Sequence, residues 1–336
     1  MSLFPSDEPC LVVVMYHFIY EDPPKILKHV PHLKLSVFVE QIRQMKSAGF
    51  VFDGSVSLSD FILNSHVKGP RFLLSFDDTL RCHSSVVAPT LDNENVKGAF
   101  SVYTKPWEDG QFTSLEMQRL IQYSIFHYDK FLEVFFETCR EKLIISEKDL
   151  EKIKPKNENI TACTNLYPND KFYSNEERFF RFIRDEVLKF KDFELAISSM
   201  FEKYCSQDDL HKELYMTRSD AQALAKGGHS ILAHSHMHPF SPAGFEGNKV
   251  YEDIIKNSQI LSKTLGFQPN GFTYPCGIKT KDYASALQRA GYKFALTAGE
   301  YNFSVIDVPQ AMSIKRVDAA QFDLTSQSMM AFVNHI

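Results

Sequence analysis

Short apolar segments alternate along much of the chain with longer segments that carry apolar residues at helical spacing. The apolar segments have the length of buried strands, and helix-capping residues flank the longer ones. The expected strands are 11–16, 72–76, 98–104, 230–233, a strand and turn over 271–277, and 293–299, and the expected helices are 36–49, 217–228, 251–266 and 280–291. Strands that alternate with helices of ten or more residues predict an α/β fold with a parallel sheet.

The stretch 106–214 interrupts this alternation. It is rich in Phe, Glu and Lys, and helical periodicity runs through 114–126, 130–144 and 176–190. We therefore expect a discontinuous barrel domain, 1–105 with 215–336, and a helical insertion subdomain, 106–214. Such an insertion could cap the mouth of the barrel, or it could be a surface elaboration or dimer interface.

Composition narrows the class of protein. The formal net charge is −5 and the pI is about 6.2, which argue against a nucleic-acid-binding surface. Six scattered cysteines without a CxxC pair favour reduced thiols over a disulfide framework, and the first residues do not resemble a secretory signal. The apolar stretch 10–15 is too short to span a bilayer. We expect a cytoplasmic protein with no membrane span.

Two adjacent carboxylates, Asp77 and Asp78, follow the apolar stretch 72–76. They would repel each other and lose hydration where a strand leaves the core. One reading is that one carboxylate caps the next helix while the other faces water. The other reading is a bound cation, with one carboxylate as its ligand and the other as a base.

A group of three histidines, His234, His236 and His238, follows the expected strand 230–233. If the segment coils, His234 and His238 share one face; if it stays extended, all three line one side. A single histidine here would usually be structural, but three within five residues favour a metal site. Two imidazoles and a carboxylate that leave open coordination positions are typical of hydrolytic or redox metal sites.

Together these segments resemble the polysaccharide deacetylases, also called NodB-homology domains or carbohydrate esterase family 4. Ser75-Phe76-Asp77-Asp78-Thr79 is similar to the family's T-F-D-D-G motif, and the stretch 234–239, His-Ser-His-Met-His-Pro, matches H-[ST]-x-x-H-P. The stretch 272–277, Phe-Thr-Tyr-Pro-Cys-Gly, is similar to the third motif, F-R-x-P-Y-G. The resemblance covers about residues 10–105 and 215–320.

The resemblance implies a distorted (β/α) barrel of the NodB-homology type with a helical insertion. It implies a carbohydrate substrate that loses an acetyl group, with N-acetyl favoured over O-acetyl. By position, Asp78, His234 and His238 would hold one divalent metal, most often zinc, although Co, Ni or Fe would also suit these ligands. Asp77 would be the general base. The backbone N–H of Cys276, in the turn with Tyr274 and Pro275, would stabilise the oxyanion.

Three departures from the family pattern affect this prediction. Thr273 stands where many members have an arginine that orients the base, so Asp77 needs another partner. Cys276 replaces a tyrosine and is interpreted as a small turn residue rather than a reactive thiol. The late Leu-x-His motif is missing, and the one histidine after residue 277 is His335. His17 is the candidate general acid.

Weaker candidates for the acid are Asp318 and His236. If no acid is present, an O-acetyl ester becomes the easier substrate because its leaving group is better. Two further alternatives stay open: a sugar deformylase or other amide hydrolase, and an inactive carbohydrate-binding protein that kept the fold.

Overall fold

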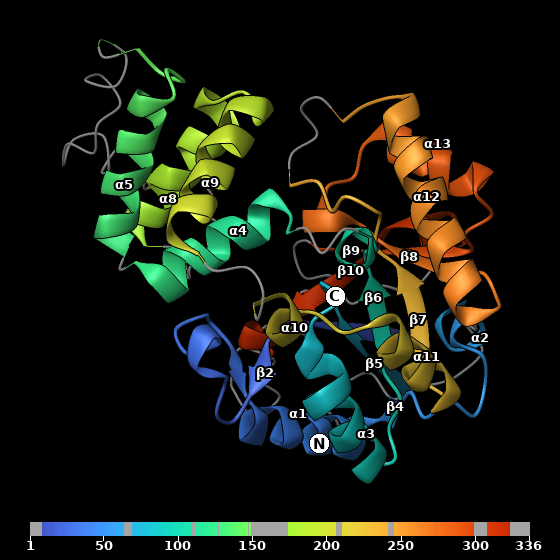
Figure 1. Ribbon diagram of the computed structural model, residues 1–336. Helices are drawn as coiled ribbons and strands as arrows, with labels where there is room; N and C mark the ends of the chain where they lie inside the picture. Colours follow the sequence, from blue (N-terminus) through green and yellow to red (C-terminus); the bar gives the residue numbers. More distant parts are fainter. Residues whose placement is uncertain are drawn as a thin grey trace.

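Seven parallel strands close a barrel in the computed structural model, which describes residues 9–63, 69–108, 112–126, 128–146, 148, 174–205, 210–240, 245–298 and 308–322. Their order around the barrel is β1-β10-β9-β8-β7-β6-β5, and β1 also pairs with β5. The short β4 extends the edge of β5, while β2 and β3 form a separate pair. The predicted α/β barrel is confirmed (Figure 1).

The bounds of the elements follow the predicted alternation. The strands are β1 Pro9–Tyr16, β2 Ile19–Tyr20, β3 Leu33–Lys34, β4 Phe50–Val51, β5 Gly69–Phe76, β6 Ala99–Val102, β7 Ser230–Ala233, β8 Gly271–Thr273, β9 Phe294–Ala298 and β10 Ile314–Asp318. The helices are α1 Leu35–Ala48, α2 Leu58–Leu63, α3 Ala88–Asn93, α4 Ser114–Leu120, α5 Tyr128–Glu141, α8 Asn175–Phe182, α9 Phe190–Tyr204, α10 Leu210–Leu214, α11 Arg218–Lys226, α12 Asn248–Leu265 and α13 Lys281–Arg289.

Local capping explains several of the helix ends. Thr217 and Asp220 form a capping box at the start of α11, and Gly266 ends α12 in the left-handed conformation. Ser36, the first residue of the helix expected over 36–49, is not the N-cap that the sequence predicts, because α1 already begins at Leu35. The backbone N–H of Ser36 instead donates to Glu21 Oε2 at 3.0 Å. The Glu21 carboxylate, which lies outside the helix, thus accepts a backbone N–H of the first helical turn, as an N-cap side chain would.

Alternate residues of the strands face different cores. One series packs inside the barrel, with Leu11, Val13, Leu73, Leu232 and Leu296 among its members. The other series faces the surrounding helices, and a set that includes Val12, Leu74, Phe100 and Phe272 packs there against α1, α12 and α13. This period of two decides which residues reach the barrel interior.

The insertion lies between β6 and α11. Its helices α4, α5, α8 and α9 gather to one side of the barrel (Figure 1). We propose the same division of the chain as the sequence predicts, although the described residues of the insertion do not form a core separate from the barrel. Its buried aromatic residues form one cluster with Phe18, Leu80 and Tyr103, which follow β1, β5 and β6. None of the helices described is both long and apolar enough to cross a membrane.

Candidate active site

The barrel interior changes from apolar to polar toward the carboxyl ends of its strands. Leu73 is followed two residues later by Ser75 and then Asp77, Leu232 by His234, and Ile314 by Arg316. Because these positions keep the inward side of their strands, the polar groups meet at one end of the barrel. All four of these polar side chains are buried.

The two adjacent aspartates separate because the backbone turns between them. Asp77 continues the inward series of β5, and its N–H still donates to Tyr16 O at 3.0 Å. Asp78 would face the helices if the strand continued, but its φ of 78° turns it toward the histidines. Thr79, with φ of 55°, continues the turn, and its hydroxyl donates to Tyr103 O. The carboxylates therefore enter different surroundings.

Asp77 is held by an arginine from the last strand. Arg316 Nη2 lies 2.7 Å from Asp77 Oδ2 and Arg316 Nη1 lies 2.9 Å from Oδ1, which makes a bidentate pair. Arg316 also donates to Ser75 Oγ at 3.2 Å. Burial alone would raise the pKa of Asp77, but Arg316, together with His234 and His17, offsets burial and holds that pKa below its ordinary value. Thr273 is not an arginine, and the arginine that pairs with Asp77 comes instead from β10.

Asp78, His234 and His238 form the predicted metal-ligand cluster. Their donor atoms all lie within 4.8 Å of one another, and the three residues are buried. Asp78 Oδ1 is 3.2 Å from His238 Nε2 and 3.6 Å from His234 Nε2, and the two Nε2 atoms are 3.1 Å apart. Two donors that are each about 2.0–2.1 Å from one tetrahedral zinc would be roughly 3.3 Å apart. The spacing therefore fits a transition metal.

The tautomer of His234 also fits a metal ligand. Its Nδ1 lies 2.8 Å from Thr273 O, and because a carbonyl can only accept, Nδ1 carries the hydrogen. When the ring is neutral, the lone pair of Nε2 is therefore free for a metal on the side of Asp78 and His238. Burial would raise the pKa of Asp78, but His238 and His234 hold it well below its ordinary value. The cluster is thus electrostatically ready for a cation.

The histidine segment coils rather than staying extended. Ser235, with φ of 66°, accepts a hydrogen bond from the N–H of His238 at 2.9 Å, which brings His238 over His234. His236 turns away, with Nδ1 2.9 Å from Thr104 Oγ1 and Nε2 3.4 Å from Glu108. It therefore lies apart from the ligand cluster.

Helix α12 holds this coiled segment through two buried polar residues. Asp253 accepts the backbone N–H groups of His236 and Met237 at 3.0 and 2.8 Å. Asn257, one turn later, donates to Val102 O at 3.0 Å and to Ser235 O. Sequence reasoning missed both residues, although polar residues four apart on the buried face of an amphipathic helix are an unusual pattern.

Two basic side chains lie on the other side of Asp78. His17 Nε2 is 3.8 Å from Asp78 Oδ2, and its side chain is 34% exposed. Arg119 Nη1, from α4 of the insertion, lies 3.3 Å from the same oxygen. One turn earlier, Glu116 is buried, and neither carboxylate oxygen has a hydrogen-bond partner among the described residues. Burial raises the pKa of Glu116 to about 7. Arg119 and Glu116 were not predicted.

The third motif forms the tight turn Pro275–Gly277. Cys276 is exposed there with φ of 51°, and the N–H of Gly277 donates to Tyr274 O at 3.1 Å. Tyr274 has the outward parity of its strand, so its ring packs in the core and its hydroxyl donates to Met312 O at 2.9 Å. The predicted part of Tyr274 in the substrate site can therefore involve only its backbone. Pro275 is buried under the turn.

Left-handed backbone conformations concentrate in the three motifs. Among the described residues, seven non-glycine residues have positive φ, and five of them are Asp78, Thr79, Ser235, His238 and Cys276. Each such residue costs on the order of 1 kcal/mol, so the surrounding hydrogen bonds must hold them. Such clusters are typical of functional sites.

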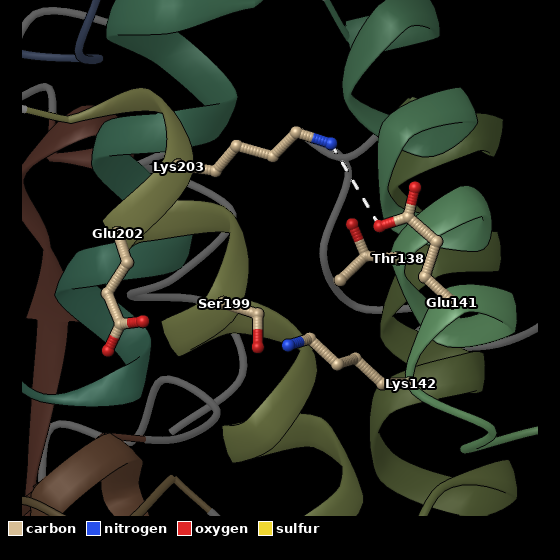
Figure 2. Close-up of a pocket in the computed structure, with 6 residues that line it drawn as sticks. All are labelled: Thr138, Glu141, Lys142, Ser199, Glu202 and Lys203. Atoms are coloured by element: carbon tan, nitrogen blue, oxygen red, sulfur yellow. Dashed lines mark ion pairs between the residues drawn. The ribbon is translucent and has the colours of Figure 1, made fainter.

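A shallow depression elsewhere on the molecule does not share these features. It has a volume of about 300 Å³ and lies on the insertion between α5 and α9 (Figure 2). Its lining residues are Thr138, Glu141, Lys142, Ser199, Glu202 and Lys203. Lys203 lies 3.9 Å from Glu141, and none of the six belongs to a motif. The candidate active site is therefore the strand-end cluster.

Comparisons with known proteins agree with this geometry. Residues 195–295 match the family model described as polysaccharide deacetylase, a stretch that includes both histidines of the cluster and Cys276. The fold is similar to the deacetylase PplD of Streptococcus pyogenes in complex with acetate, with 14% identity, a TM-score of 0.52, and coverage of 93% of this chain and 92% of that one.

Two further solved structures have the same fold. IcaB from Ammonifex degensii is 14% identical with a TM-score of 0.52, and 98% of each chain is covered. A de-N-acetylase from Aggregatibacter actinomycetemcomitans is 12% identical with a TM-score of 0.51, covering 95% of this chain and 99% of that one. No curated protein matches the chain. These likenesses confirm the predicted NodB-type barrel.

Proposed function

We propose that this chain is a hydrolase of the polysaccharide deacetylase family, acting on carbon–nitrogen bonds other than peptide bonds, and that it removes N-acetyl groups from a carbohydrate or glycan precursor in a metal-dependent reaction. One observation carries the proposal: the adjacent carboxylates are divided between two tasks. Asp78 faces two imidazoles at metal-ligand spacing, whereas Asp77 is paired with Arg316.

Asp78, His234 and His238 would hold the metal, for which zinc is the first choice and Co, Ni or Fe would also suit the donors. When bound, the metal supplies Lewis-acid chemistry that lowers the pKa of water and polarises the acetyl carbonyl. Asp77, kept ionised by Arg316, accepts a proton from the attacking water. The backbone N–H of Cys276 would donate to the developing oxyanion.

The leaving nitrogen needs a proton, and His17 is the proposed donor. Its partly exposed side chain lies beside Asp78, at the end of β1. The two weaker candidates have other partners: Asp318 Oδ1 accepts the N–H of Ala320, and His236 contacts Thr104 and Glu108. A proton donor within the site supports an N-acetyl substrate over an O-acetyl ester.

The cytoplasmic location belongs to the proposal as well. Cys82, Cys139, Cys205 and Cys276 are all free thiols, which supports a reducing compartment.

Metal content and acetate release together test the proposed function. We expect wild-type protein to bind one zinc ion and to release acetate from N-acetylated sugars. Asp78→Asn and His234→Ala should lose the zinc, whereas Asp77→Asn should keep it and lose about 10²–10⁴-fold in kcat. His236→Gln is the matched control, because this histidine belongs to the same segment and faces away from the cluster.

Two results would contradict the proposal. If wild-type protein stays free of zinc after loading, the proposed metal site is wrong. If the protein binds zinc but releases no acetate, the proposed deacetylase activity is wrong. Formylated sugars and O-acetyl esters belong in the same screen, because they separate the alternative hydrolases.

A further inference from the structure

The two oxygens of Asp78 face different groups. Oδ1 faces His238 and His234 at 3.2 and 3.6 Å, which is the ligand side of the cluster. Oδ2 faces Arg119 Nη1 at 3.3 Å and, at 3.8 Å, His17. The rotation of this carboxylate therefore depends on Arg119, which comes from the insertion rather than from the barrel.

Arg119 is itself held in place from two directions. Its guanidinium lies over the ring of Phe18 at 5.4 Å. Its helix, α4, is capped by Thr113, whose hydroxyl accepts the N–H of Glu116. Leu120, the next residue, is buried in the cluster that the insertion shares with the barrel. The helix is thus fixed on both sides of the arginine.

The shared cluster surrounds the metal ligands. Leu80 lies two residues after Asp78, and Phe240 lies two residues after His238; both belong to this cluster. Tyr103, a third member, lies with its ring 5.0 Å from that of His238. Packing of the insertion is therefore continuous with the packing that supports the ligands.

We propose that Arg119 is a positioning residue for the metal ligand Asp78, and that the helical insertion is a working part of the metal centre. The proposal rests on the proposed metal site and adds to it the part of the chain that the family motifs leave unexplained. Arg119 fixes Oδ2, so that Oδ1 stays turned toward the two imidazoles before the metal arrives.

Charge and orientation predict opposite results when Arg119 is removed. A guanidinium near a divalent cation repels it, so on charge alone the removal would strengthen metal binding. Loss of orientation weakens it, typically 10–100-fold when an outer partner of a ligand is lost. The sign of the change therefore decides between a positioning residue and a simple counter-charge.

Zinc titration of the full-length metal-free protein tests the proposal. We expect Arg119→Ala to bind zinc 10–100-fold more weakly than wild type, and Arg119→Lys, which keeps a donor, to recover part of the loss. Lys203→Ala is the matched control because Lys203 is a cation of the insertion paired with Glu141 in α5. Urea midpoints of the metal-free variants show that each is folded.

Amide hydrogen exchange gives a second measurement that does not depend on activity. Zinc should slow exchange in 114–120 of wild type, and this protection should be lost in Arg119→Ala. Equal or tighter zinc binding by Arg119→Ala would overturn the inference alone. An equal loss in Lys203→Ala would overturn it too, since the effect would then be general. Wild-type protein that binds no zinc would overturn the proposed metal site as well.

Discussion

Asp77 and Asp78 are neighbours in sequence, but one positive φ angle sends their side chains to different partners. Asp77 points into the barrel toward Arg316, and Asp78 points toward His234 and His238. Placing a carboxylate in the barrel interior without a cation would cost several kcal/mol, so the arginine is a condition for an ionised base at this position.

Substitution of Arg316 tests this dependence. Arg316→Met leaves a buried carboxylate unpaired, so we expect a loss of about 3–5 kcal/mol in the free energy of unfolding. We also expect at least about a 10²-fold loss in kcat, because the base is no longer oriented. Urea unfolding and acetate release measure the two effects.

The double variant Asp77→Asn with Arg316→Met provides the control. Removal of both charges should recover much of the lost stability but none of the activity. If the single variant were as stable and as active as wild type, the pairing of Arg316 with Asp77 would have no functional role.

The cluster of Asp78, His234 and His238, with Asp77 beside it, could be predicted from sequence because each residue lies in a short local motif. Arg316 could not, since its partner is 239 positions away and a charged residue facing a barrel interior breaks the usual apolar pattern. The positively charged partner that Thr273 cannot give to Asp77 is therefore Arg316. It comes from a strand two places further around the barrel.

At the scale of elements, α12 links the helical layer to the site. Its residues Asp253 and Asn257 accept from and donate to the coiled segment that carries the histidines. The side-chain amide of Asn257 also reaches Thr104 Oγ1 at 3.2 Å. One helix therefore sets the conformation of residues whose φ angles are positive.

Asn257→Ala should weaken the site without touching a ligand. Loss of this buried amide leaves acceptors unpaired, so we expect a decrease of about 1–3 kcal/mol in the free energy of unfolding, with weaker zinc binding. Gln222→Ala is the matched control, because its amide donates to Thr264 O outside the site. Zinc binding by Asn257→Ala equal to that of the control would contradict this role.

Most elements could be predicted because their signals are local. The start and the end of α11 follow from its capping residues Thr217 and Gly227, and the end of α12 follows from Gly266. In contrast, β10 alternates Ile314, Lys315 and Arg316, with a charge on each face, so periodicity does not distinguish it. The helices of the insertion were predicted as a block, but their contact with the site depends on tertiary packing. His335 lies outside the described residues.

For the molecule as a whole, the shared aromatic cluster predicts cooperative unfolding. Phe18, Leu80 and Tyr103 of the barrel pack with residues of the insertion in one cluster, so unfolding of either part breaks this shared cluster. We expect one transition in urea. Fluorescence of the single tryptophan, Trp107, and far-UV circular dichroism should give the same midpoint.

Leu80→Ala examines this coupling from the barrel side. Leu80 is fully buried, so the substitution should cost about 2–5 kcal/mol and lower both midpoints together. A fluorescence midpoint that stays in place while the circular dichroism midpoint falls would show that the insertion and barrel unfold separately.

Closure of the barrel between its first and last strands has a consequence for biosynthesis. Arg316 lies on β10, which pairs with β1 and β9, whereas Asp77 lies on β5. A growing chain carries both carboxylates and all three histidines of the motif long before Asp77 gains its partner. The proposed hydrolysis therefore requires that the strand carrying Arg316 has been synthesised and has docked between β1 and β9.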